Sequence, residues 1–196
     1  TQEVVGTTFI DDCQWDRSEE YIEYGNVLVH DTVNACIKAA GRVETSSAYP
    51  KTGKVGNGLY FFDVKVVSPR STNIAYPSCV FGMQTMVSNP FSNGSGYYLE
   101  LQYNNGGPGT FLLKRYIEGV GTNIASASYT MALNTQYTIQ VVWIGTTISI
   151  YVNGVYLFSA TDSTYSDGYF GIYDGGSMST ETYDCRYSNI GFIAAS

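Results

Sequence analysis

The sequence is poor in charge, and most of the charge that it carries is negative. Only 10 of the 196 residues are Lys or Arg, against 17 Asp or Glu, so the formal net charge at pH 7 is −7. The basic residues are spread along the chain, whereas a nucleic-acid-binding surface needs a clustered basic footprint. No run of about 18 apolar residues is present. The sequence therefore predicts neither a nucleic-acid partner nor a membrane span.

Histidine is scarce, and the cysteines are scattered. The single histidine, His30, ends an expected strand, which favours a turn or surface role over a nucleophilic triad. None of the four cysteines lies within four residues of another, so the short spacings of zinc and redox motifs are absent. An even count favours two disulfides in an oxidising compartment, with buried free thiols as the alternative. Of the three pairings we expect Cys13 with Cys185, since the first and last strands of a sandwich often neighbour each other, and Cys36 with Cys79.

The clearest positive pattern lies between residues 137 and 160. Every second residue from Tyr137 to Trp143 is apolar, and this period of two places one face of a strand in a core. The alternation breaks at residues 145–147 and resumes over residues 148–152. Asn153-Gly154 follows, and this pair is typical of a type I′ turn, which needs positive φ at both central residues. The segment predicts three consecutive antiparallel strands.

Short strand-like runs with turn residues between them continue through the rest of the chain. Helix formers are sparse, while 21 Gly and 18 Tyr fit many strands joined by tight turns. The stretches 41–58 and 68–77 are expected to be loops, because Gly, Pro and Ser interrupt them. No linker stands out, so the pattern predicts one all-β domain over residues 1–196, either a sandwich or a barrel. The other expected strands are residues 4–10, 21–24, 27–30, 35–39, 59–67, 79–87, 97–103, 111–117, 124–129, 168–173 and 185–194.

Several of these strands and turns, taken in order, resemble a known superfamily. They are Phe9-Ile10-Asp11-Asp12 with Trp15, Tyr98-Leu99-Glu100-Leu101, Leu112-Leu113-Lys114-Arg115 with Glu118-Gly119, Ile124-Ala125, Tyr137–Val141, Ile148–Gly154, Gly168–Tyr173 and Asp184–Ile190. This order is similar to that of the concanavalin A-like lectin/glucanase superfamily, in its laminin-G-like and carbohydrate-binding-module branches. The resemblance covers most of the chain and is specific for the fold rather than for an activity. It implies an all-β, two-sheet antiparallel β-sandwich, a jelly roll with one concave face that is often used to bind glycans.

The catalytic motifs of that superfamily are missing. The E-x-D-x-x-E strand of laminarinase-type hydrolases is absent, as are the R-x-E-x-R strand and Q-I-H triplet of alginate-lyase-type members. Glycoside hydrolysis needs two carboxylates across a cleft. The best candidates are Asp63 and Glu100, on the polar faces of two strands. An ion-paired sheet face, with Lys65 or Lys114 as partner, is the favoured alternative, and we assign no catalytic residue.

A binding face is the more attractive interpretation of the polar strand positions. Tyr98, Glu100 and Gln102 alternate on one strand, and neighbouring strands can add further polar and aromatic groups. Sugar recognition uses aromatic faces for stacking and planar amides or carboxylates for hydroxyl groups. The alternatives are ordinary cross-strand tyrosine pairs and, for the tryptophan, a core position between the sheet edges. The candidate ligand-binding residues are Gln84, Tyr98, Glu100, Gln102, Lys114, Tyr116 and Trp15.

The resemblance also implies a calcium ion, since related modules often hold a structural calcium near their termini. Asp11, Asp12 and Asp184 are the candidate ligands if the chain ends meet. Asp is equally an ordinary turn residue, as it would be at Asp162, Asp167 and Asp174. Asn93-Gly94-Ser95 is a glycosylation sequon in an expected loop.

The combined prediction is a secreted or surface-displayed, lectin-like module that binds a glycan or polysaccharide without cleaving it. One alternative is a structural or adhesive jelly-roll subunit of a virion or extracellular assembly, which would contact copies of itself or other surface proteins. The second is a polysaccharide hydrolase or lyase with an unrecognised carboxylate pair.

Overall fold

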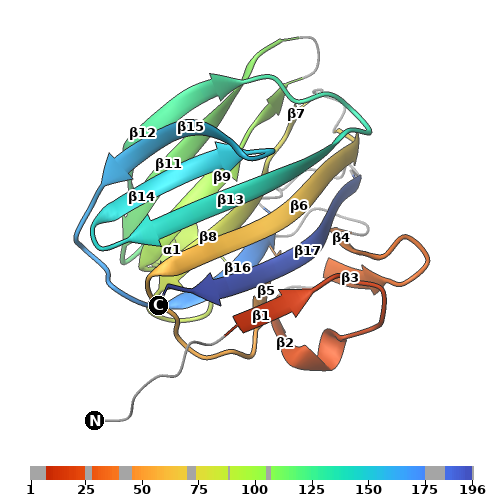
Figure 1. Cartoon of the computed structure of the whole chain (residues 1–196), viewed down its shortest axis with the longest axis horizontal. Coiled ribbons are helices and arrows are strands. Elements are labelled where there is room, and N and C mark those ends of the chain that lie inside the picture. Colours follow the sequence, from red (N-terminus) through yellow and green to blue (C-terminus); the bar gives the residue numbers. More distant parts are fainter. Residues whose placement is uncertain are drawn as a thin grey trace.

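The computed structural model describes residues 8–24, 28–39, 46–69, 74–87, 89–104, 107–174 and 184–195. These residues form two antiparallel β-sheets stacked face to face, a jelly-roll sandwich (Figure 1). The all-β, two-sheet prediction is therefore confirmed. Residues 4–7 of the first expected strand lie outside the described residues. Within the described residues, no helix is long and apolar enough to cross a membrane.

The eight-stranded sheet lies in front in Figure 1 and contains the hairpins predicted from the sequence. Its strands run in the spatial order β15-β14-β13-β6-β17-β4-β3, and β1 pairs with the same strand, β17, that pairs with β4. Their bounds are β15 Val155–Thr161, β14 Thr147–Val152, β13 Gln136–Ile144, β6 Gly58–Ser68, β17 Asp184–Ala194, β4 Cys36–Ala39, β3 Leu28–Asp31 and β1 Thr8–Asp11.

The seven-stranded sheet lies behind it, in the order β12-β11-β9-β8-β16-β5-β2. The bounds are β12 Val120–Tyr129, β11 Gly109–Ile117, β9 Gly96–Leu101, β8 Pro77–Met83, β16 Tyr169–Asp174, β5 Ser46–Pro50 and β2 Tyr21–Tyr24. The remaining elements are short: a separate pair of strands, β7 Ile74–Ala75 with β10 Tyr103–Asn104, a 3₁₀ turn η1 Ser18–Glu20, and a one-turn helix α1 Pro90–Asn93.

The predicted hairpins are present. β13 pairs with β14 and β14 with β15, all antiparallel. At the second turn Asn153 has φ of 52° and Gly154 has φ of 77°. These are the two left-handed residues that a type I′ turn requires. The alternation of β13 places Ile139, Val141 and Trp143 in the core, as their spacing predicts.

Two expected loops contain strands. Residues 41–58 include β5, whose five residues are all buried between β2 and β16. Both faces of this strand are covered, so its sequence, Ser-Ser-Ala-Tyr-Pro, does not need to alternate between apolar and polar residues. Residues 68–77 include β7, and the weak strand at 124–129 is part of the ten-residue β12. In each case pairing with a neighbour decides the structure over local propensity.

Aromatic side chains fill the space between the sheets. Tyr60 of one sheet lies 5.7 Å from Phe81 of the other, measured between ring centroids, and 4.7 Å from Phe192. Trp143 meets Tyr97 edge to face at 5.4 Å. Buried hydroxyl groups need partners. For example, the Tyr187 hydroxyl crosses the core, donating to Tyr173 O and accepting from the backbone N–H of Ser78 in the opposite sheet.

Candidate functional site

The outer face of the seven-stranded sheet, which points away from the core, collects most of the predicted ligand-binding residues. Tyr98, Glu100 and Gln102 alternate with core residues along β9 and just beyond it. The register between β9 and β11 places Lys114 opposite Tyr98. Lys114 Nζ lies 3.0 Å from Glu100 Oε2 and 5.6 Å from the centroid of the Tyr98 ring. Glu100, Lys114 and Tyr98 are thus in mutual contact.

The two tyrosines predicted to bind a ligand on this face, Tyr98 and Tyr116, are buried. Tyr98 is 1% exposed, and its hydroxyl lies 2.9 Å from Ser78 Oγ. Its ring meets Tyr116 and Tyr173 edge to face at 6.1 and 5.5 Å. Burial raises the pKa of Tyr98 well above its ordinary value. These side chains belong to a second apolar cluster, here called the tyrosine cluster: Tyr49, Val80, Met83, Tyr98, Tyr116 and Tyr173. They cannot stack on a sugar and instead form a rigid floor beneath Glu100 and Lys114.

The segment between β8 and β9 covers part of this face. Met86 and Val87 pack on the tyrosine cluster. Val87 O accepts hydrogen bonds from Ser47 Oγ at 2.8 Å and from the Tyr49 hydroxyl at 3.0 Å. These bonds fix the segment over β5 and leave the β9 and β11 side of the sheet less covered.

Gln84 anchors the start of the same segment. Its Nε2 donates to the carbonyls of Gly82, at 3.0 Å, and Asp167, at 2.8 Å, and its Oε1 accepts from Lys54 Nζ at 3.2 Å. Both ends of the amide are therefore engaged, which gives Gln84 a structural role in this structure.

The open part of the face runs along β9 and β11. Glu100 and Lys114 are 12% and 19% exposed at their side chains, and Leu112 and Gln102 are also partly exposed. Just past Gln102 the chain enters an open groove of about 400 Å³ at the end of the sandwich. Its lining includes Tyr103, Asn104, Pro108, Thr130 and Leu133. This volume falls within the range of small-molecule sites.

The carboxylate pair considered from the sequence does not exist. Asp63 lies on β6 of the eight-stranded sheet and points outward, where it accepts hydrogen bonds from Thr138, Gln136 and Asn189. Glu100 lies on the outer face of the other sheet. The two acids are on opposite sides of the sandwich, so they cannot act together on one glycosidic bond.

Trp15 lies apart from the other candidates. It falls between β1 and η1 and is 77% exposed, so it is not a core residue. Close to it in sequence, Asp16, Ser18, Glu23, Val29 and His30 line a hollow of about 230 Å³. Sequence reasoning missed Asp16 and Glu23 as partners in a hollow. The only available signal was the density of acidic residues in that stretch.

The predicted calcium ligands are committed to other groups. Asp11 is fully buried, accepts from the Tyr21 hydroxyl and the Cys13 N–H, both at 2.8 Å, and lies 3.7 Å from Arg17. Asp184 is paired with Arg186 at 2.8 Å. Across the described ranges no three His, Cys, Asp or Glu side chains are grouped to hold a metal. In the described residues, Asp11, Asp12 and Asp184 are therefore not brought together as one group of metal ligands.

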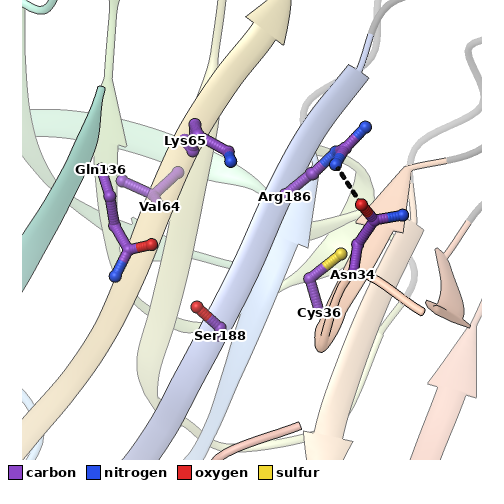
Figure 2. Close-up of a pocket in the computed structure, with 7 residues that line it drawn as sticks. All are labelled: Asn34, Cys36, Val64, Lys65, Gln136, Arg186 and Ser188. Carbon is purple, nitrogen blue, oxygen red and sulfur yellow. Dashed lines mark hydrogen bonds between the residues drawn. The ribbon is translucent and has the colours of Figure 1, made fainter. Parts of the chain in front are cut away.

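The predicted disulfides are absent. All four cysteines are buried free thiols. Cys36 lines a pit of about 30 Å³ on the outer side of the eight-stranded sheet, beside Arg186 and Ser188 (Figure 2). Cys79 lies in the core on the inner face of the other sheet, so these two cannot pair. Burial raises the pKa of Cys13 to about 12, which keeps this thiol protonated at neutral pH.

The fold is shared with known carbohydrate-active proteins, although the sequences are far apart. No protein-family model and no curated protein sequence matches the chain. Among solved structures, the carbohydrate binding module CBM66 from Bacillus subtilis aligns with a TM-score of 0.67 at 15% identity, covering 87% of this chain and 93% of that one.

Two further structures extend the similarity. The exoplasmic/lumenal domain of VIP36, bound to Ca²⁺ and Man3GlcNAc, has a TM-score of 0.69 at 10% identity, covering 96% of this chain and 89% of that one. A Bacillus licheniformis β-glucanase has a TM-score of 0.62 at 13% identity, covering 98% and 100%. The chain thus has the concanavalin A-like jelly-roll fold that the sequence resemblance implies.

Proposed function

We propose that this chain is a non-catalytic carbohydrate-binding module. The observation that carries the proposal is the open part of the outer face of the seven-stranded sheet. There the Glu100 carboxylate and the Lys114 ammonium group lie beside the buried Tyr98 ring, and the chain runs on through Gln102 to an open groove. These groups supply the paired donors and acceptors that sugar hydroxyls need.

The similarity to a binding module and a lectin domain supports binding, while the similarity to a glucanase keeps hydrolysis as the rival function. The arrangement of carboxylates favours binding. Glu100 is ion-paired with Lys114, and Asp63, its one proposed partner in catalysis, lies on the other side of the sandwich. A secreted or lumenal setting fits this proposal. The four thiols are buried and free, so the proposal does not depend on disulfides.

A glycan array on the unmodified chain tests the proposal, followed by titration of the best ligand. Glu100→Gln removes one charge at the proposed face, and we expect it to weaken binding by about tenfold. Glu118→Gln is the matched control, because it makes the same chemical change at an exposed turn on the β11–β12 edge. Tyr98→Ala is unsuitable, since truncating a buried ring perturbs the fold.

A blank array would contradict the proposal, and large assemblies in mass photometry would then favour the structural alternative. Release of reducing sugar by the unmodified chain, lost in Glu100→Gln, would favour the hydrolase.

A further inference from the structure

Negative charge is concentrated at the N-terminal edge of the sandwich. Residues 11–31 contain seven acidic side chains and one basic one, Arg17, so they carry a formal −6 of the net −7. Arg17 is already engaged, with Glu20 through its Nε at 2.8 Å and with Asp11 at 3.7 Å. Lys38 of the neighbouring β4 is paired with Asp31 at 2.6 Å, and the edge remains net negative after both basic residues are counted.

The hollow beside Trp15 in the sequence, which is lined by Asp16, Ser18, Glu23, Val29 and His30, lies where the edge strands of the two sheets meet. Glu23 comes from β2, the last strand of the seven-stranded sheet, and His30 from β3, the last strand of the other. Asp16 and Ser18 come from the connection that leads into β2. The backbone N–H of Ser18 donates to Asp16 Oδ1 at 3.0 Å and lowers the pKa of Asp16. Both carboxylates of the hollow thus belong to a formed structure rather than to a chain end.

His30 supplies the second observation. Its side chain is only 6% exposed, and its ring is fixed edge to face against Tyr21 at 5.3 Å. Nε2 has no hydrogen-bond partner among the described residues and lies 3.4 Å from Glu23 Oε1. A buried polar atom left in this state needs a partner. A group carrying several N–H donors satisfies the imidazole nitrogen and the Glu23 carboxylate at once.

The carboxylates of the hollow differ from several others in the chain. Asp31, Glu100, Asp162 and Asp184 are each paired with a Lys or Arg within 3.0 Å. By contrast, neither Asp16 nor Glu23 has a Lys or Arg partner in the parts of the chain that the structure describes. The described Lys and Arg residues therefore leave these two carboxylates unpaired, and His30, 3.4 Å from Glu23 Oε1, offsets their charge only when it is protonated.

We propose that this hollow binds the primary ammonium group of an amine-bearing sugar, at a site separate from the face around Glu100. The inference rests on the proposed function, that the chain binds carbohydrate. An ammonium group brings three donors and a positive charge to Asp16, Glu23 and His30.

Isothermal titration with two oligomers of the same backbone tests this directly: a β-1,4-linked glucosamine oligomer and its fully N-acetylated form. They differ in charge at the nitrogen. We expect the amine form to bind about tenfold more tightly at low salt, with the preference falling as salt rises. Glu23→Gln should remove the preference, whereas Glu118→Gln, which makes the same change in net charge, should retain it. Unfolding midpoints close to that of the unmodified chain show that the variants are folded.

Equal affinity for the two oligomers would overturn the inference and leave the proposed function standing. An equal loss of the preference for the amine oligomer in Glu23→Gln and Glu118→Gln would do the same. Tighter binding of a lysine-rich peptide or of Ca²⁺ than of the amine oligomer would also overturn it. Failure of every glycan, charged or neutral, would instead overturn the proposed function itself.

Discussion

Asp63 and Glu100 occupy similar positions on opposite sides of the sandwich, yet their surroundings differ. Each stands on the outer face of an interior strand of its sheet. Asp63 is 4% exposed and accepts from three neutral donors, including Thr138 Oγ1 at 2.6 Å and Gln136 Nε2 at 2.7 Å. Glu100 is partly exposed and has one cationic partner, Lys114.

The difference separates a structural acid from one that is available to a ligand. The Asp63 carboxylate has its acceptor positions filled by side chains of β6's neighbours, β13 and β17, and so ties three strands together. The Glu100 carboxylate is partly exposed and has a single lysine as its cationic partner, an arrangement that we propose leaves both groups able to meet a ligand. A polar residue on a sheet face therefore indicates a binding site only when its partners leave it unsatisfied.

The largest expected effect concerns the floor under Glu100. Tyr98→Ala removes a fully buried ring, and we expect it to lower the free energy of unfolding by about 3–5 kcal/mol. Tyr98→Phe removes only the hydroxyl that contacts Ser78 and should cost about 1 kcal/mol. Urea denaturation measures both. A Tyr98→Ala variant that unfolds at the unmodified midpoint would show that the tyrosine cluster is not a rigid floor.

Asp63→Ala tests the structural side of the comparison. It leaves the donors of Thr138, Gln136 and Asn189 without their acceptor, so we expect a loss of about 2 kcal/mol in the free energy of unfolding. Glycan affinity should stay unchanged. If Asp63→Ala abolished binding while the fold kept its stability, the roles of the two acids would be reversed.

Glu100→Gln tests the other side. Because the Glu100–Lys114 pair is partly exposed, its loss should change stability by less than about 1 kcal/mol. The same variant should weaken glycan binding, and the two measurements together separate a ligand-binding role from a structural one. A stability loss as large as that of Asp63→Ala would place Glu100 among the structural acids.

A third carboxylate sharpens the comparison through pH. The hydrogen bond from Lys38 Nζ, with help from Asn34, holds the pKa of Asp31 at about 2, below its ordinary 3.8. A lowered pKa means that the stabilisation is complete above pH 3.8 and is lost as pH falls toward 2. Unfolding midpoints followed from neutral to acid pH should show a step in this window that shrinks in Asp31→Asn. An unchanged step would assign it to another group.

Much of the fold could be predicted because local sequence patterns determine many of the strand pairs. The Asn153-Gly154 turn and the alternation along β13 fix the central hairpins without help from the rest of the chain. β5 escaped prediction because its buried state depends on β2 and β16, which lie far away in sequence. Its sequence alone favours a loop.

The grouping of residues at the candidate face was predicted, but their exposure was not. The alternation in β9 correctly brings Tyr98, Glu100 and Lys114 together, because register follows from the strand pattern. Whether Tyr98 faces a ligand or a covering segment depends on where residues 84–87 fold, and no local pattern encodes that. The cysteine pairing failed for the same reason. An even count says nothing about which face of which sheet each thiol occupies.

The central claim is that the outer face of β9 and β11 binds a glycan without cleaving it. A ¹⁵N NMR titration with the best array ligand tests it most directly. The account predicts progressive shifts at Glu100, Gln102 and Lys114, with the glycan recovered intact. Shifts confined to other parts of the molecule, or a shortened glycan at the end of the titration, would contradict it.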